Sequence, residues 1–557
     1  MSRVADVLRF ETIRAGLQMI TDEMAVRFAR SSLSPVIRDY LDFSAALCAP
    51  DGRVVVQGFS LPLHLGAIPR AMEAVLAAFP DGLAPGDVAL LNDPYAGGMH
   101  LPDVFVVAPA YGGDELLAYT VLVAHQVDIG GRVPGGSAAD SREIFEEGIR
   151  LPPVLMVEGG RRNQALQSVI GANVRLPDML NRDLQAQEAG CRAGAAALVA
   201  LAGEHGHDAY RDAVARIFEH GRRGLADTLA RWPAGTYRFE DVEDHDGTAD
   251  RAVPIHVAVT IGGGRIRLDF TGTSPQVRGS INSTLSFTES AAYAAVRSLC
   301  DDDIPVNAGF TSLVDVVAPE GTVVHARFPA GVAARGVIGY RIIECVFGAL
   351  ADALPGKVPA AGDGGTSGLR IGGIGSDGRR FQCNDLVCGA WGAHPHHDGL
   401  DGAAGMAANV SNRSIEVLER EEPVRVVGYG FVDDSGGPGR HRGGLAIRRA
   451  LQLLAPEAVL NLRTHRNRTP PYGLGGGHPG AVSATVLVRN GERRPLPAKT
   501  TVEIRRGDIV EHTTASGGGI GDPKERDRSA VAADVRDGKI ASSSARAIYG
   551  LTEEELP

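Results

Sequence analysis

The stretch between Asn92 and Asp128 most constrains how this chain can fold. An apolar run of the buried-strand type, residues 87–91, leads directly into the turn-rich segment Asn92–Asp103, and a further apolar run connects that segment to Ala124–Gly131. Such runs predict strands, and polar segments at strand ends are loops whose side chains a rigid scaffold positions. The sequence therefore predicts a functional site at the ends of these strands.

Two His-x-x-Asp units lie in this stretch, His100 with Asp103 and His125 with Asp128. Imidazole nitrogen and carboxylate oxygen suit borderline and hard divalent cations, and neighbouring glycines let the backbone approach closely. A single unit with this spacing is more often a surface or capping pair. Two units that bracket a predicted strand favour a metal site, with ordinary surface pairs as the alternative.

The composition narrows the class of protein. A chain of 557 residues exceeds what one hydrophobic core supports, so roughly two to four domains are expected. The net charge of -11 argues against a nucleic-acid-binding surface, and the six cysteines include no Cys-x-x-Cys pair that would indicate a zinc ribbon. The N-terminus lacks a signal-peptide core, and the longest apolar run, residues 195–202, is too short to span a bilayer. A cytoplasmic protein without a membrane partner is expected.

The order of the predicted elements indicates a mixed α/β (α+β), multidomain fold. Residues 1–231 are expected to form an N-terminal domain that holds the metal site and ends in a helical hairpin. Residues 232–420 are expected to form a mixed α/β middle domain, since alternating strand patterns there are followed by helical patterns. Residues 421–557, with alternating Val and Arg runs broken by Gly-Gly and Pro-Gly turns, are expected to form a β-rich C-terminal domain.

The individual helices and strands follow from apolar periodicity. Spacings of three and four predict a long amphipathic helix from residue 6 to about 30, and two apolar runs on either side of the Asp51-Gly52 turn predict a strand hairpin over residues 39–56. Further helices are expected at 68–79, 177–201, 207–230, 289–300 and 336–353, with short ones near 528–534 and 542–549. Antiparallel strands are expected at 237–242, 256–261 and 265–270.

Several carboxylates outside the two units are candidates for the site. Asp42 interrupts an otherwise apolar predicted strand, where a carboxylate is costly unless it is paired, hydrogen-bonded or metal-bound. It is a candidate third ligand, and a half-exposed position on an edge strand is the equal alternative. Glu143, Glu146 and Glu147 lie at helical spacing, so one of them is a candidate general base, although a solvated helix face is the more common reason for such a pattern.

The segment Trp391–Gly399 holds the densest group of histidines, His394, His396 and His397. Imidazoles this close in sequence are compatible with a second metal site or a substrate site. A flexible polar loop is the favoured interpretation, because a His-rich tract by composition alone does not define a site.

Nine ordered stretches of the chain resemble the B-type subunit of the hydantoinase/oxoprolinase family. The resemblance extends along almost the whole length, which makes a chance match of so many ordered motifs hard to obtain. The stretches are Leu41–Ser44, Asn92–Asp103, Ala124–Gly131, Glu147–Pro153, Asn173–Arg175, Asp269–Gln276, Glu416–Glu421, Asp434–Arg440 and Ser516–Pro523.

The resemblance implies one subunit of a two-component, ATP-dependent hydrolase of small cyclic amides such as hydantoins, oxoproline or lactams. In such systems an A-type subunit carries the ATP site and phosphorylates the ring carbonyl oxygen, and the B-type subunit opens the activated ring at a metal. This chain has no Gly-x-x-x-x-Gly-Lys-Ser/Thr loop, which is consistent with ATP being bound by the partner in a hetero-oligomer.

The family's metal ligands fall on Asp42, His100, Asp103 and His125 of this sequence. Two nitrogens and two carboxylates suit one Zn, Mn or Fe(II) ion better than Ca or Mg. The resemblance makes Asp128 an active-site carboxylate that orients an imidazole or a water, beside Glu146 and Glu147 as catalytic candidates.

Two departures from the family pattern limit what carries over. Met99 stands where a small polar residue is common, and Gln126 stands where a second histidine often follows. Both lie beside proposed ligands, so the resemblance does not imply which cyclic amide this chain prefers. The large metal-binding subunit of ATP-dependent ketone carboxylases is similar as well, and a non-catalytic scaffold with a structural metal is the third alternative.

Overall fold

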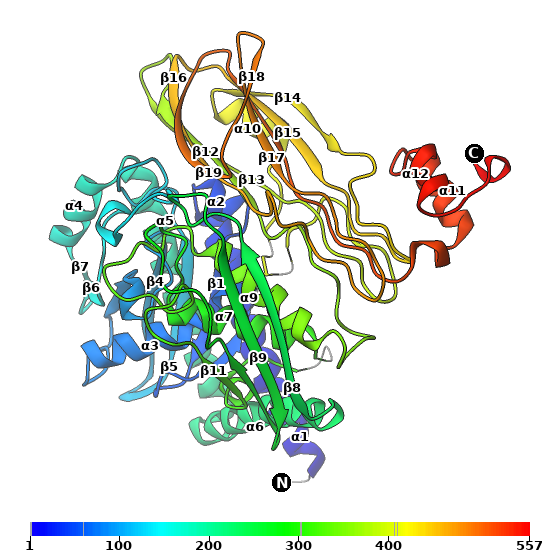
Figure 1. Cartoon of the computed structure of the whole chain (residues 1–557). Helices are drawn as coiled ribbons and strands as arrows, with labels where there is room; N and C mark the ends of the chain where they lie inside the picture. The colour runs from blue at the N-terminus through cyan, green and yellow to red at the C-terminus, as the bar shows by residue number, and fades with distance from the viewer. Residues whose placement is uncertain (1–2, 59–60, 301–303, 406, 409) are drawn as a thin grey trace.

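Four β-sheets and the helices between them make up the part of the chain that the structure describes. This computed structural model describes residues 3–58, 61–300, 304–405, 407–408 and 410–557 (Figure 1). Helices and sheets alternate along the chain, three of the sheets are antiparallel and the second contains one parallel pair, and two of the four sheets are formed by residues 367–513. The expected mixed, multidomain α+β class is confirmed.

The first sheet has seven strands in the order β2-β1-β5-β4-β3-β6-β7, each antiparallel to its neighbours. The apolar segment that follows Asp103 folds as two long strands of this sheet, joined at a turn where Gly113 adopts a φ of 66°. The strands are β1 (Phe43–Cys48), β2 (Val54–Gln57), β3 (Val88–Leu91), β4 (Asp103–Gly112), β5 (Glu115–His125), β6 (Val154–Glu158) and β7 (Arg161–Arg162).

Helices cover both faces of this sheet. The apolar stripe of the first helix and one side of α5 pack together on one face, and α3 and α7 contribute to the core on the other face. The predicted N-terminal helix and the predicted helical hairpin are both confirmed. The helices are α1 (Arg3–Ser31), α2 (Pro35–Arg38), α3 (Ala67–Ala78), α4 (Gln164–Asn173), α5 (Pro177–His205) and α6 (His207–Arg231).

The middle third adds a second sheet, in the order β11-β10-β9-β8, and two helices that pack against each other. One buried core joins residues of the first sheet to residues of this sheet and to α9. The expected boundary at residue 231 therefore crosses a shared core. The elements are β8 (Gly235–Glu243), β9 (Val253–Gly262), β10 (Arg265–Asp269), β11 (Val314–Val317), α7 (Leu285–Ser298), α8 (Ala308–Thr311) and α9 (Gly336–Leu350).

Two further sheets pack face to face around a third core, and Figure 1 shows them in yellow and orange above the rest of the chain. One has the order β13-β12-β16-β19 and the other β14-β15-β20-β17-β18. A division at residue 420 would cut the first of these sheets, because strands before and after that residue pair directly. The elements are β12 (Ser367–Ile374), β13 (Arg380–Val387), α10 (Ile415–Glu421), β14 (Val424–Phe431), β15 (Ile447–Leu453), β16 (Glu457–Arg463), β17 (Ala484–Arg489), β18 (Glu492–Pro495), β19 (Lys499–Arg505) and β20 (Ile509–Thr513).

The chain ends in a small helical unit, α11 (Arg528–Arg536) and α12 (Ser542–Ala547), drawn in red at the right of Figure 1. It has its own small apolar cluster. Arg526 ties it to the sheets, since its guanidinium contacts Asp398 at 2.6 Å and Asp534 at 2.7 Å. Across the described residues, the helices are all too short or too polar to cross a membrane.

Candidate metal centre

His100, Asp103 and His125 meet where the β4–β5 hairpin opens. Asp103 is the first residue of β4 and His125 the last of β5, and the two are direct partners in the antiparallel register. His100 lies in the loop before β4, and its Nε2 is 3.1 Å from Asp103 Oδ1. One nitrogen or oxygen from each residue lies within 4.8 Å of the others, and all three side chains are buried.

The nitrogen and oxygen atoms that these three side chains direct towards one another fit a divalent cation. His100 Nδ1 lies 3.1 Å from the Ala333 carbonyl, which directs Nε2 towards Asp103. Within the described residues, His125 Nδ1 is buried without a hydrogen-bond partner, and His100 Nε2 and Asp103 Oδ1 lie 3.1 Å apart without the geometry of a hydrogen bond. Each such atom costs about 1–3 kcal/mol, so three together indicate a ligand that satisfies them. Nitrogen and carboxylate oxygen suit Zn, Mn or Fe(II).

The charge states of the three side chains suit the same ligand. Burial lowers the pKa of His100 to about 4 and lowers the pKa of His125 well below its usual range, so both imidazoles are neutral. Burial alone would raise the pKa of Asp103, but the Arg335 guanidinium and His100 outweigh it and hold that pKa below its ordinary value. The group therefore offers two neutral nitrogens and an ionised carboxylate.

Asp42 reaches the same cavity from a different element. It immediately precedes β1 rather than lying inside it, and Leu41 before it has a φ of 58°, a strained value for a non-glycine residue. The Asp42 carbonyl accepts the backbone N–H of His125 at 3.0 Å, which joins the two segments. Burial raises the pKa of the Asp42 carboxyl to about 7, and the nearby Asp103 charge adds to the effect. Asp42 is not one of the residues grouped within 4.8 Å.

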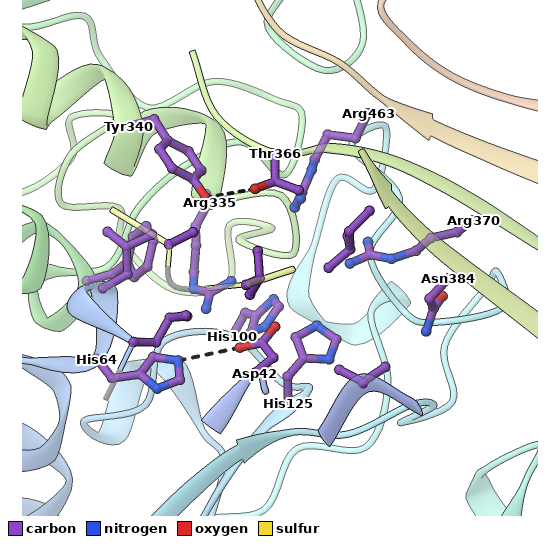
Figure 2. A pocket seen from close by; sticks show the side chains of 18 residues that line it. Asp42, His64, His100, His125, Arg335, Tyr340, Thr366, Arg370, Asn384 and Arg463 are labelled. Carbon is purple, nitrogen blue, oxygen red and sulfur yellow. Dashed lines mark hydrogen bonds and ion pairs between the residues drawn. The ribbon is translucent and has the colours of Figure 1, made fainter. Parts of the chain in front are cut away.

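His64 is a member of the site that the sequence did not predict. It ends the short 3-10 helix η1 (Pro62–His64), and its Nδ1 lies 2.8 Å from Ser44 Oγ on β1. Its Nε2 faces Asp42 Oδ1 at 4.0 Å (Figure 2). Burial lowers the pKa of His64 to about 4, so it too is neutral. It shares no recognisable spacing with the other histidines, and only the packing of η1 against β1 brings it there.

A cavity of about 80 Å³ lies beside these residues. That volume has room for several water-sized groups next to the three donors. Three arginines line it, Arg335 before α9, Arg370 on β12 and Arg463 on β16, and Figure 2 shows their side chains turned towards the histidines. Arg335 forms an ion pair with Asp103 and lies over the Phe287 ring, 4.4 Å from its centre. The cavity therefore combines a candidate cation site with arginine side chains on its opposite wall.

Asp128, expected to orient a ligand or a water, holds a loop instead. Its carboxylate accepts the backbone N–H groups of Gly130 and Gly135 at 3.3 Å and of Arg175 at 2.6 Å. The Arg175 guanidinium adds an ion pair at 3.1 Å. With both oxygens engaged in this way, Asp128 does not line the cavity formed by the described residues.

Glu146 and Glu147 also lie outside the lining of that cavity as described. Glu146, half-exposed in the 3-10 helix η3 (Ile144–Glu146), is 3.3 Å from Arg132 Nε. Glu147 is buried, and its Oε1 accepts the N–H of Val332 at 2.7 Å. Burial raises the pKa of Glu147 well above its usual range, which favours the protonated form of the carboxyl. The three carboxylates expected to be catalytic thus contact supporting loops.

The histidine-rich loop lies apart from this cavity, beside the arginine that anchors the C-terminal helices. The rings of His394 and His397 stack with their centres 4.6 Å apart, and His396 lies 5.5 Å from His394. No group of metal-ligating donors within 4.8 Å forms here among the described residues. The interpretation as a polar surface loop is the one that these positions favour.

Comparisons with known proteins find relatives along nearly the whole chain. The family model described as hydantoinase B/oxoprolinase matches residues 6–523. A putative B-type subunit of a D-/L-hydantoinase from a Pseudomonas strain is 30% identical over 98% of this chain and 95% of its own length. The solved ATP-dependent caprolactamase of Pseudomonas jessenii has a TM-score of 0.93 at 28% identity, covering 98% of this chain and 97% of its own.

A solved nucleotide-free acetone carboxylase shares the fold, with a TM-score of 0.90 at 20% identity, over 98% of this chain and 79% of that one. At this identity the likeness concerns the fold alone. The family match, by contrast, covers nearly the whole sequence, including every stretch that forms the cavity's histidine and aspartate wall. The chain belongs to the hydantoinase B/oxoprolinase family.

Proposed function

We propose that this chain is the B-type subunit of a two-component, ATP-dependent cyclic amidohydrolase. Its substrate is a small cyclic amide, a hydantoin, oxoproline or a lactam, whose carbonyl oxygen a separate A-type subunit has phosphorylated. Support comes from the family match and from the related hydantoinase and caprolactamase subunits. The observation that carries the proposal is the convergence of three buried, unpartnered donors, on His100, Asp103 and His125, at one wall of a cavity.

His100, Asp103 and His125 would hold one divalent ion, with Asp42 as the fourth ligand. When bound, such an ion supplies Lewis acidity, which makes water a stronger nucleophile near neutral pH. The Ala333 carbonyl fixes the orientation of the His100 ring, and Arg335 fixes the Asp103 carboxylate. These contacts preorganise the site, so that its geometry is set before substrate enters.

The cavity favours a catalytic role over a purely structural one. A structural metal is enclosed by protein ligands, whereas a catalytic one keeps an open position. Here the donors of His100 and His125 and the Asp42 carboxylate line the cavity itself. His64, neutral and facing Asp42, is placed to hold that carboxylate in position or to accept a proton from it.

Metal content and ring opening test the proposal together. We expect His100→Ala and Asp103→Ala to lose the bound metal by elemental analysis, and to lose ring opening by at least about 100-fold, because each removes a donor. His256→Ala is the matched control, since His256 is an exposed histidine on β9 that contacts Glu240. Full metal occupancy in both site variants would overturn the ligand assignment.

The reaction class is tested by co-expression with an A-type subunit. We expect ATP-dependent opening of at least one of hydantoin, N-methylhydantoin, oxoproline and caprolactam, followed by product analysis. Consumption of a ketone with bicarbonate, without opening of any cyclic amide, would instead identify the ketone carboxylase alternative. A metal-replete complex inactive in both assays would identify a scaffold.

A further inference from the structure

Two arginines project from one face of the β13-β12-β16-β19 sheet into the cavity. In the antiparallel register Arg370 lies opposite Asn461 and Asn384, and Arg463 lies opposite Gly368. Side chains at these paired positions share one face of the sheet. The intervening residues, Leu369, Ile371 and Leu462 among them, point to the other face and form the core between the two C-terminal sheets.

Arg370 and Arg463 are buried without a counter-ion of their own. Only 6% of Arg370 and 9% of Arg463 are exposed. In the part of the chain that the structure describes, neither guanidinium has a carboxylate within 4.0 Å or a hydrogen bond. The Nε of each is a buried atom without a partner. Burial lowers the pKa of Arg370 to about 9, and the Arg463 charge adds to the effect. A buried cation without a partner is strongly unfavourable.

Other buried arginines of this chain are paired. Arg449 contacts both oxygens of Asp385, at 2.6 and 3.0 Å, and Arg466 contacts Asp241 at 2.7 Å. Both of these guanidiniums are as deeply buried as those of Arg370 and Arg463. The fold therefore supplies carboxylates to buried arginines elsewhere, and the lack of them at the cavity is specific to that site.

The balance of charge in the cavity points to a dianion. Asp42 is the carboxylate among the described residues that line the cavity, and Asp103 behind it is already paired with Arg335. The charges that remain are one negative charge on Asp42, one positive charge each on Arg370 and Arg463, and the two positive charges of a divalent ion when the site holds one, so the loaded cavity has an excess of three positive charges. Guanidinium groups match the oxygens of phosphate in a bidentate manner, and two of them offset its two negative charges. A monocarboxylate would offset only one.

We infer that Arg370 and Arg463 form a subsite for a phosphate group, beside the histidine and aspartate wall. This inference rests on the proposed function, in which the group is the phosphoryl group on the activated ring carbonyl. The two arginines bind and position that group, and make or break no bond. Asn384, on the same face of the sheet and lining the same cavity, faces the ligand from β13.

Binding of inorganic phosphate to the full-length, metal-loaded chain tests the subsite without ATP, a cyclic amide or the partner subunit. We expect calorimetry to detect phosphate binding that Arg370→Gln and Arg463→Gln each weaken at least tenfold. Sulfate, also a dianion, should compete, and acetate should bind at least tenfold more weakly than phosphate. The control is Arg379→Gln, an arginine 88% exposed in its side chain at the β12–β13 turn.

Thermal unfolding separates loss of binding from loss of fold. Because the unpaired charge is unfavourable, we expect Arg370→Gln to unfold at the same or a higher temperature than the wild type in phosphate-free buffer. Phosphate should raise the unfolding temperature of the wild type and of Arg379→Gln, but not that of Arg370→Gln. Equal phosphate binding by wild type and both site variants, or acetate binding as tight as phosphate binding, would overturn the subsite. Neither result depends on which ring, if any, the complex opens.

Discussion

At the scale of single residues, the groups that contact a buried carboxyl decide whether it is ionised. Asp103 is buried but lies against Arg335, and its pKa stays low. Glu147 is buried just as deeply, but its carboxyl accepts only backbone N–H groups and its pKa rises. The first is suited to a cation and the second to a neutral hydrogen-bonding role. The sequence around Asp103 and Glu147 does not reveal this difference in pKa, because it depends on which groups pack against each carboxyl in the fold.

Substitution of Glu147 tests whether it supports the fold or acts in catalysis. We expect Glu147→Gln to stay within about 1 kcal/mol of the wild-type free energy of unfolding, since a neutral amide keeps the acceptor for the Val332 N–H. Glu147→Ala removes that acceptor and leaves a void, with an expected loss of about 2–4 kcal/mol. Chemical denaturation measures both. A Gln variant that folds normally but no longer opens the ring would restore the catalytic role expected from the sequence.

At the scale of elements, the β4–β5 hairpin turns a sequence motif into a site. Its register places Asp103 directly opposite His125. Two candidate ligand residues that lie 22 residues apart in the sequence therefore meet at the open end of the hairpin. Helix α5 packs across these strands and also holds the start of α2, because Asp183 accepts the backbone N–H of Leu33 at 2.7 Å and that of Ser34. The segment that carries Asp42 follows directly, so α5 helps to set the position of that residue.

The titration of Asp183 gives a pH dependence that belongs to this contact. Burial raises the pKa of Asp183 to about 6, from about 4 in an unfolded chain. The native state therefore binds this proton more tightly, and the stability that the group contributes is greatest below about pH 4 and falls as pH rises through about 6. We expect Asp183→Asn to reduce the change in the free energy of unfolding between pH 4 and 7 by up to about 3 kcal/mol.

Urea denaturation at the two pH values measures this effect. Asp178→Asn is the matched control, because Asp178 is an exposed aspartate in the first turn of the same helix. The control should keep the pH dependence of the wild type. An Asp183→Asn variant with the same dependence as the wild type would contradict the assignment.

At the scale of the whole molecule, buried ion pairs join the middle and C-terminal sheets. Lys499 on β19 contacts Glu243 on β8 with Nζ and Oε1 2.5 Å apart, and neither side chain is exposed. Arg341 on α9 lies 3.7 Å from the other Glu243 oxygen. Arg463, on the same sheet as Lys499, and Tyr340, next to Arg341 on α9, both line the cavity. The pairs therefore help to fix the distance between the two walls of the site.

Removal of one member of the Lys499–Glu243 pair should be costly, and removal of both much less so. We expect Lys499→Met to lower the free energy of unfolding by about 3–5 kcal/mol, because it leaves a buried carboxylate with a weaker partner. Lys499→Met combined with Glu243→Gln should recover at least half of that loss. Denaturation midpoints compare the variants, with the exposed Lys524→Met as control. A double variant no more stable than Lys499→Met would show that the loss does not come from the buried carboxylate left without its lysine.

The sequence by itself determined the local elements, the family and the residues of the His100–Asp103 unit. Apolar periodicity is a local property, so the long N-terminal helix, the helical hairpin and the β-rich end were predictable from it. A ligand motif within one hairpin was predictable for the same reason. In the sequence, Arg370 and Arg463 each stand next to apolar residues in an alternating strand pattern. That pattern does not show which part of the molecule the face with the arginines points to.

Only the tertiary structure decided the rest of the site. His64 and the two arginines come from segments up to hundreds of residues apart, and pairing of strands across residue 420 brings the C-terminal sheet over the histidines. Asp128 matches the His-x-x-Asp pattern as well as Asp103 does, yet backbone N–H groups use its oxygens. Long-range packing determines which polar groups lose water and which partners they meet, and this is what separates a ligand from a loop contact.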